Sequence, residues 1–222
     1  MNITSDQKRI IESVISVFEG GKATGNYAAI STFDDAPNGS AQVSYGKHQA
    51  TEFGALKPLL ELYVAKKGQY AQNIEQYIDQ IGKQTLASND HFIELLSWCS
   101  RDDIMRQCQD EIFQERYFKR ALKYADDNLF FKPLSLLVFY DSYIHGSPMA
   151  NFLINRFSEV KPIHGGDEKT WVEKYVITRR AWLNGSIKLK PTVYRMDTML
   201  KLISENNWDL IPPFFVNGVK II

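Results

Sequence analysis

The sequence has few of the features that mark several large classes of protein. It contains two cysteines, Cys99 and Cys108, too few for a disulfide framework, and we expect both to be buried free thiols. Its apolar runs, such as residues 136–140, are far shorter than the ~20 residues of a membrane-spanning helix. The first residues also lack the basic and apolar regions of a signal peptide. We therefore expect no insertion into a membrane.

An excess of one charge is also missing. The 26 lysines and arginines balance the 26 aspartates and glutamates, so no overall field favours nucleic acid as a partner. The histidines, at positions 48, 91, 145 and 164, do not show metal-ligand spacing. The sequence has neither a Gly-x-Ser-x-Gly motif nor a glycine-rich nucleotide loop. We expect no metal and no cofactor.

Most of the sequence shows the periodicity of amphipathic helices. In the first predicted helix Ser5 is a candidate N-cap, Gly20-Gly21 ends the helix, and one apolar stripe consists of Ile11, Val14, Ile15 and Phe18. Residues 27–33 and 42–46 are predicted strands joined by the turn Pro37-Asn38-Gly39. Further helices are predicted at residues 55–66, 69–83, 90–99, 102–125, 133–146, 148–158, 167–183 and 192–206. The chain is thus predicted to be mainly α, with a small N-terminal β-hairpin.

The length of 222 residues suits one domain built from two lobes. We expect residues 157–167 to link the lobes and the hairpin to lie beside a cleft between them.

Glu19 and Asp35 are the candidate chemical groups. Glu19 continues the apolar stripe and lies at the negative end of the helix dipole, and both effects favour the protonated form that a general acid needs. Asp35 follows a strand at the mouth of the turn, where Asp34 is an alternative. A solvated helix-end Glu and a turn-forming Asp are the structural alternatives. Hydrolysis of a glycosidic bond usually requires two carboxyl groups of this kind.

The spacing of Glu19, Tyr27 and Asp35 resembles the signature of glycoside hydrolase family 46, the chitosanases of the lysozyme-like superfamily. The resemblance implies that Glu19 is the general acid and that Asp35 is the base that activates water. It also implies a hydroxyl that helps to hold this water. Ser44 is the first candidate for that hydroxyl and Ser40 the alternative.

The resemblance extends along the chain. Residues 139–146 are similar to the central helix of the family, whose aspartate, here Asp141, belongs to an ion-pair network behind the acid. Arg180 and Arg195 resemble the arginines of that network, although an ion pair with only a structural role is equally compatible with these residues. Residues 207–213 are similar to the C-terminal stretch of the family. Further residues expected to line the cleft are Tyr27, Tyr45, His48, Gln49 and Glu52.

These observations predict a monomeric enzyme that hydrolyses a β-1,4-linked amino-sugar polymer at internal bonds, with inversion. Chitosan is the expected polymer, and the glycan strand of peptidoglycan, cut by a muramidase-like enzyme, is the alternative. A binding module without activity is a weaker alternative because both carboxylates are present. Such a polymer lies outside the cytoplasm, so we expect the protein to be extracellular or delivered to the cell envelope.

Overall fold

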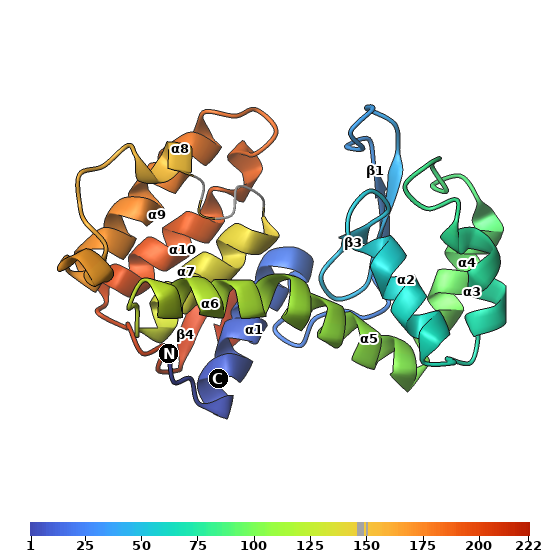
Figure 1. Cartoon of the computed structure of the whole chain (residues 1–222), viewed down its shortest axis with the longest axis horizontal. Coiled ribbons are helices and arrows are strands. Elements are labelled where there is room, and N and C mark those ends of the chain that lie inside the picture. The colour runs from blue at the N-terminus through green and yellow to red at the C-terminus, as the bar shows by residue number, and fades with distance from the viewer. Residues whose placement is uncertain (146–148, 150) are drawn as a thin grey trace. The chain divides into compact units, whose positions relative to one another are not determined.

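The computed structural model of the chain describes residues 1–145, 149 and 151–222 (Figure 1). It confirms a mainly helical fold with a small antiparallel sheet. The chain forms two compact units, one from Met1–Ala23 with Arg116–Ile222 and the other from Thr24–Glu115. The predicted linker at residues 157–167 is wrong, because this segment lies inside the first unit and Phe157 packs on Trp171 there.

The first unit is built around one buried helix. Its elements are α1 (Ser5–Gly20), α6 (Lys119–Asp127), α7 (Pro133–Ile144), α8 (Asn151–Ile154), α9 (Glu168–Asn184), α10 (Tyr194–Ser204), the 3₁₀ turns η2 (Pro162–His164) and η3 (Lys190–Thr192), and the strands β4 (Phe214–Val216) and β5 (Val219–Ile221). Helix α7 is buried along nearly its whole length and packs against α1, α6, α9 and α10. Figure 1 shows α7, α9 and α10 side by side. None of the helices described is long and apolar enough to cross a membrane.

Helix α1 follows the prediction closely. Thr4, rather than Ser5, is its N-cap, and a capping box with Gln7 satisfies the first free amide groups. Gly21 ends the helix in the left-handed region at φ 70°, a conformation that glycine adopts without steric cost. The predicted apolar stripe is buried in the core of the first unit. This burial fixes the rotation of α1 and so determines which side its last residues face.

The C-terminal end of the chain differs from the prediction. Strands β4 and β5 form a second hairpin, with Phe214 opposite Ile221, where no strand was predicted. Its turn contains Asn217 and Gly218, both with positive φ, which is the same Asn-Gly signal that marks the first hairpin. The strands are three residues each, too short for a reliable alternating pattern.

The second unit joins a small sheet to four helices. Its elements are β1 (Ile30–Phe33), β2 (Gln42–Tyr45), β3 (Ala50–Thr51), α2 (Leu56–Ala65), α3 (Ala71–Ile78), α4 (Asp90–Cys99) and α5 (Asp103–Phe113). The predicted hairpin is present as β1 and β2, and β3, which was not predicted, pairs with the other edge of β2. Both cysteines are buried and free, as expected.

Most predicted helices agree with the structure to within a few residues. The predicted helix at 102–125 is instead α5, a π-helical stretch η1 (Gln114–Phe118) and α6 in succession. Residues 146–148 and 150, where one predicted helix ends and the next begins, lie outside the described residues.

Asp102 caps α5 and also joins three segments of the second unit. Its carboxylate accepts hydrogen bonds from the amide of Ile104, the hydroxyl of Tyr63 and the amide of Gln69. The side chain of Asn89, the N-cap of α4, accepts among the described residues only the local bond from the amide of Phe92.

We therefore expect Asn89→Ala to lower the free energy of unfolding by about 1 kcal/mol, the usual loss for an N-cap. Asp102→Ala should lower it by at least ~2 kcal/mol, because hydrogen bonds to a charged group from two other segments are lost as well. Urea denaturation of both variants measures the difference. Equal losses would show that the bonds from Tyr63 and Gln69 contribute no net stability.

Candidate active site

Glu19 lies in the last turn of α1 with its side chain only 12% exposed. The carbonyl end of a helix carries partial negative charge, which disfavours a second negative group there. Burial raises the pKa of Glu19 above its ordinary value of 4.5, against the opposing charge of Arg195, and the nearby charge of Asp141 raises it further. Both effects expected from the sequence are therefore present at this carboxyl group.

Arg195 connects Glu19 to Asp141. Its guanidinium lies 2.8 Å from Glu19 Oε1 and 2.9 Å from Asp141 Oδ1, and it donates a further hydrogen bond of 3.1 Å to the carbonyl of Phe18. Asp141, in the buried helix α7, is fully shielded from solvent. A buried carboxylate needs a cationic partner, and the planar fork of arginine suits this arrangement. The structure thus brings together Glu19, Asp141 and Arg195 as predicted from the sequence.

Arg180 does not belong to this network. It forms an exposed ion pair with Asp197, whereas the preceding residue, Arg179, is completely buried. Arg179 lies near His145, with 3.4 Å between its Nη2 and the His145 carbonyl oxygen. The buried face of α9 runs through positions 172, 176, 179 and 183, and a residue one step further is rotated by about 100° towards solvent. The assignment of Arg180 behind Glu19 is therefore wrong.

Asp35 occupies a different environment in the second unit. It lies just beyond β1 in the exposed hairpin turn, next to Asp34, which is also exposed. Oδ1 of Asp35 accepts a hydrogen bond of 2.9 Å from the side-chain amide of Gln42. This bond distinguishes Asp35 from Asp34, and it comes from a residue that was not predicted to have a role.

The two candidate hydroxyl groups differ in their access to solvent. Ser44 is in the central strand β2, opposite Ser31 and Thr51, and is only 2% exposed. Ser40 is partly exposed in the turn, and its carbonyl accepts a hydrogen bond from the amide of Ala36, the residue after Asp35. A hydroxyl that holds a water molecule beside Asp35 must reach solvent. The structure therefore favours Ser40 over Ser44 for this position.

Three of the predicted cleft residues are buried. Tyr45, His48 and Glu52 are at most 5% exposed, so the structure contradicts their assignment to a surface that contacts a polymer. His48 stacks on Phe113 with 4.2 Å between ring centroids, and burial lowers its pKa to about 3, so it is neutral at pH 7.

Glu52 has a structural role in the sheet. Its two carboxylate oxygens accept hydrogen bonds of 2.7 Å from the amides of Val43 and Leu86. It is therefore not free to bind a cationic sugar, as an exposed carboxylate would be. Gln49 is partly buried, and its side-chain oxygen accepts a hydrogen bond from Ser31.

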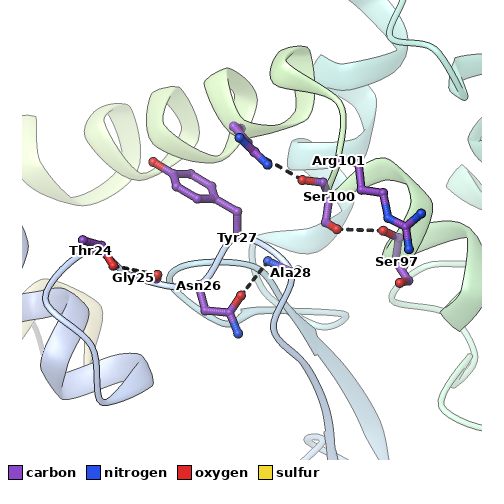
Figure 2. A pocket seen from close by; sticks show the side chains of 9 residues that line it. Thr24, Gly25, Asn26, Tyr27, Ala28, Ser97, Ser100 and Arg101 are labelled. Atoms are coloured by element: carbon purple, nitrogen blue, oxygen red, sulfur yellow. Dashed lines mark hydrogen bonds between the residues drawn. The ribbon is translucent and has the colours of Figure 1, made fainter.

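Tyr27 borders a hollow in the second unit. Its ring is partly exposed, and its hydroxyl donates a hydrogen bond to Asp110. The cavity has a volume of about 510 Å³. Figure 2 shows Tyr27 on one side of it, with Ser100 and Arg101 on the other. The residues that line this cavity are Thr24, Gly25, Asn26, Tyr27, Ala28, Ser97, Ser100, Arg101 and Arg106. Tyr27 remains accessible to a ligand, unlike the buried Tyr45.

Comparison with known families decides the assignment. The family described as glycosyl hydrolase family 46 matches this chain over residues 13–214. The chain belongs to glycosyl hydrolase family 46. It is therefore a glycoside hydrolase, as the resemblance of its motifs predicted.

Known members of family 46 resemble the chain over nearly its whole length. A curated chitosanase from Bacillus subtilis (strain 168) is 24% identical over 236 residues, which cover 97% of this chain and 83% of the relative. Among solved structures, the chitosanase from Gynuella sunshinyii in complex with chitotetraose has a TM-score of 0.83 at 20% identity, covering 99% of this chain and 98% of that one. The native chitosanase from Bacillus subtilis MY002 has a TM-score of 0.81 at 23% identity, with full coverage of both chains. The structural likenesses show a common fold.

Two polar residues were missed from the sequence, namely Arg179, which lies beside His145, and Gln42, which bonds to Asp35. The burial of Arg179 could have been predicted, because its position in the sequence falls on the apolar stripe of α9 with Val172, Val176 and Leu183. The contact of Gln42 with Asp35 could not have been predicted, because it depends on the register of the hairpin and the path of the turn.

We expect Asp141→Asn to lower the pKa of Glu19. The negative charge of Asp141 raises that pKa, so its removal stabilises ionised Glu19 beside Arg195 and moves the titration to lower pH. Carbon-13 NMR of labelled glutamate carboxyl groups measures the shift. Asp197→Asn, in the exposed pair with Arg180, is the control that should leave Glu19 unchanged. A Glu19 pKa that stays the same or rises in Asp141→Asn would contradict this account.

Proposed function

We propose that this family 46 glycoside hydrolase cleaves chitosan at internal β-1,4 bonds by single displacement. The observation that carries the proposal is Glu19, a buried carboxyl group with a raised pKa, held by Arg195 and Asp141 at the end of α1. The relatives support the choice of polymer, because they are named chitosanases, and solved structures of such relatives contain chitotetraose or 6 GlcN.

In the proposed mechanism, Glu19 is the general acid. It donates its proton to the glycosidic oxygen as the bond to the anomeric carbon breaks, which makes the leaving group a neutral alcohol. Ionised Glu19 is then stabilised by Arg195, which lies 2.8 Å away. A carboxyl group whose pKa is raised by burial and that has a cation beside it suits both stages of this step.

Asp35 is the proposed base. It accepts a proton from a water molecule whose oxygen attacks the anomeric carbon on the face opposite the leaving group. Its exposed position lets water reach the carboxylate, and the hydroxyl of Ser40 in the same turn, which donates its proton to Asn38 Oδ1, can accept a hydrogen bond from that water. Release of the proton from Asp35 and its uptake by Glu19 complete the cycle.

The charges at the hairpin suit a cationic polymer. Each deacetylated sugar of chitosan carries an ammonium group, which favours exposed carboxylates near the bond that is cut. Asp34 and Asp35 supply two such groups side by side. Because chitosan lies outside the cytoplasm, we also propose that the enzyme acts outside the cell or at the cell envelope.

Parallel assays of new reducing ends test the substrate. We expect activity on highly deacetylated chitosan and little on purified peptidoglycan sacculi. Activity on sacculi alone would replace chitosan by peptidoglycan as the substrate. Binding to either polymer without any cleavage would contradict the enzymatic proposal.

Glu19→Gln should lower kcat on chitosan by about 10²- to 10⁴-fold, the usual loss when a general acid is removed. Glu12→Gln in the same helix is the matched control, because Glu12 is half-exposed and pairs only with Lys8 among the contacts described. Asp35→Asn should be similarly damaging, whereas Asp34→Asn should retain most activity. A more severe effect of Asp34→Asn would move the role of base to Asp34.

The reaction should invert the anomeric centre. A base that activates water delivers it to the face opposite the leaving group, so a β-linked polymer gives the α-anomer first. Proton NMR of the products during the first minutes, before mutarotation equilibrates them, identifies the anomer. Initial appearance of the β-anomer would show retention and would make one carboxylate a nucleophile.

A further inference from the structure

We propose that Gln42 is a positioning residue for Asp35, selecting which oxygen of that carboxylate faces the attacking water. This inference rests on the proposed function, in which Asp35 is the base, and it assigns a role to a side chain that would not itself touch the substrate.

The two ends of the Gln42 side chain make different contacts. Nε2 donates a hydrogen bond of 2.9 Å to Asp35 Oδ1, and Oε1 accepts one of 3.2 Å from the backbone amide of Phe53. An amide N–H can only donate and a carboxylate can only accept, so the two partners allow a single orientation of the side-chain amide. Gln42 is 5% exposed, and water competes little for these bonds.

The support beneath Gln42 is rigid. Gln42 begins β2 directly opposite Phe33, the last residue of β1, so it lies across the hairpin from the segment that leads to Asp35. The neighbouring Val43 is tied to Glu52 twice, through its amide to the carboxylate and through its carbonyl to the Glu52 amide. Glu52 in turn holds Leu86. The amide that meets Asp35 therefore extends from a fixed strand, although Asp35 itself lies in an exposed turn.

The hydrogen bond treats the two oxygens of Asp35 differently. Oδ1 is occupied by the amide, and among the described residues Gln42 is the partner that holds it. Oδ2 is left to accept the proton of water. Without Gln42 the carboxylate can rotate about its χ angles, and the fraction of molecules with a correctly placed oxygen falls. Small displacements of a reacting group can cost about 100-fold in rate, so this bond should affect kcat rather than substrate affinity.

Gln42→Leu and Gln42→Glu separate positioning from stability. Gln42→Leu keeps the approximate shape but removes both bonds, and we expect kcat on chitosan to fall roughly 10- to 100-fold with little change in KM. Gln42→Glu keeps an acceptor for the Phe53 amide but places a second carboxylate against Asp35. Its kcat should fall most at neutral pH and recover partly at acidic pH, where one of the two carboxyl groups is protonated.

Gln109→Leu is the matched control. Gln109 is also buried, and its side chain donates to the carbonyl of Tyr27 and accepts from the amide of Lys47, without contacting Asp35. Its loss should reduce the melting temperature at least as much as Gln42→Leu while kcat is retained. Equal loss of kcat in both leucine variants would reduce Gln42 to a structural role and overturn the inference.

A measurement without substrate keeps the two proposals distinguishable. The side-chain amide resonances of Gln42, followed by nitrogen-15 NMR, should move with the ionisation of Asp35 and lose that dependence in Asp35→Asn. Absence of this dependence would overturn the inference. The inference would also be overturned if Gln42→Leu kept the full kcat of the wild type while Asp35→Asn was inactive. A wild-type protein that does not cut chitosan, with the NMR dependence intact, would instead contradict the proposed function.

Discussion

The arrangement around Arg195 is the interaction on which the first unit depends. One guanidinium, almost completely buried, contacts a carboxyl group at the end of α1, a second in the last turn of α7 and the backbone carbonyl beside the first. Removal of this cation would leave Asp141 buried without a partner, a loss of about 3–5 kcal/mol in comparable cases. The same contact therefore opposes the rise in the pKa of Glu19 that burial causes, and it holds three helices together, so stability and chemistry cannot vary independently here.

The two proposed catalytic carboxyl groups owe their roles to opposite surroundings. Glu19 is buried at the negative end of a helix, which favours its protonated form, while the adjacent Arg195 stabilises the anion. Asp35 lies in an exposed turn and meets a neutral amide rather than a charge. Environments that separate two chemically similar groups in this way are a common means of assigning acid and base in one site. The proposed division of roles thus rests on the local surroundings of each carboxyl group.

Periodic features of the fold could be predicted from the sequence, and contacts that depend on tertiary register could not. The stripe of α1 and the Asn-Gly turn are local patterns, and they placed Glu19 and Asp35 correctly on their elements. Glu52 was expected to face the polymer, yet two backbone amides from different segments hold it inside. Arg179 and Arg180 are adjacent arginines, and they differ in that Arg179 lies on the buried face of α9 and Arg180 does not. Gln42 gains its contact from strand pairing, which a single sequence does not specify.

The order of segments within the first unit has a consequence for synthesis on the ribosome. Residues 24–115 form one continuous unit, whereas α1 belongs with residues 116–222. Domains fold as they emerge from the ribosome, N-terminal parts first, but α1 must wait for the rest of the first unit with its apolar stripe uncovered. Arg195 follows Glu19 by 176 residues in the sequence, so Glu19 gains its cation only after this long intervening stretch has been made. A nascent chain that ends before Arg195 therefore leaves the apolar stripe of α1 uncovered and lacks the cation that lies beside Glu19.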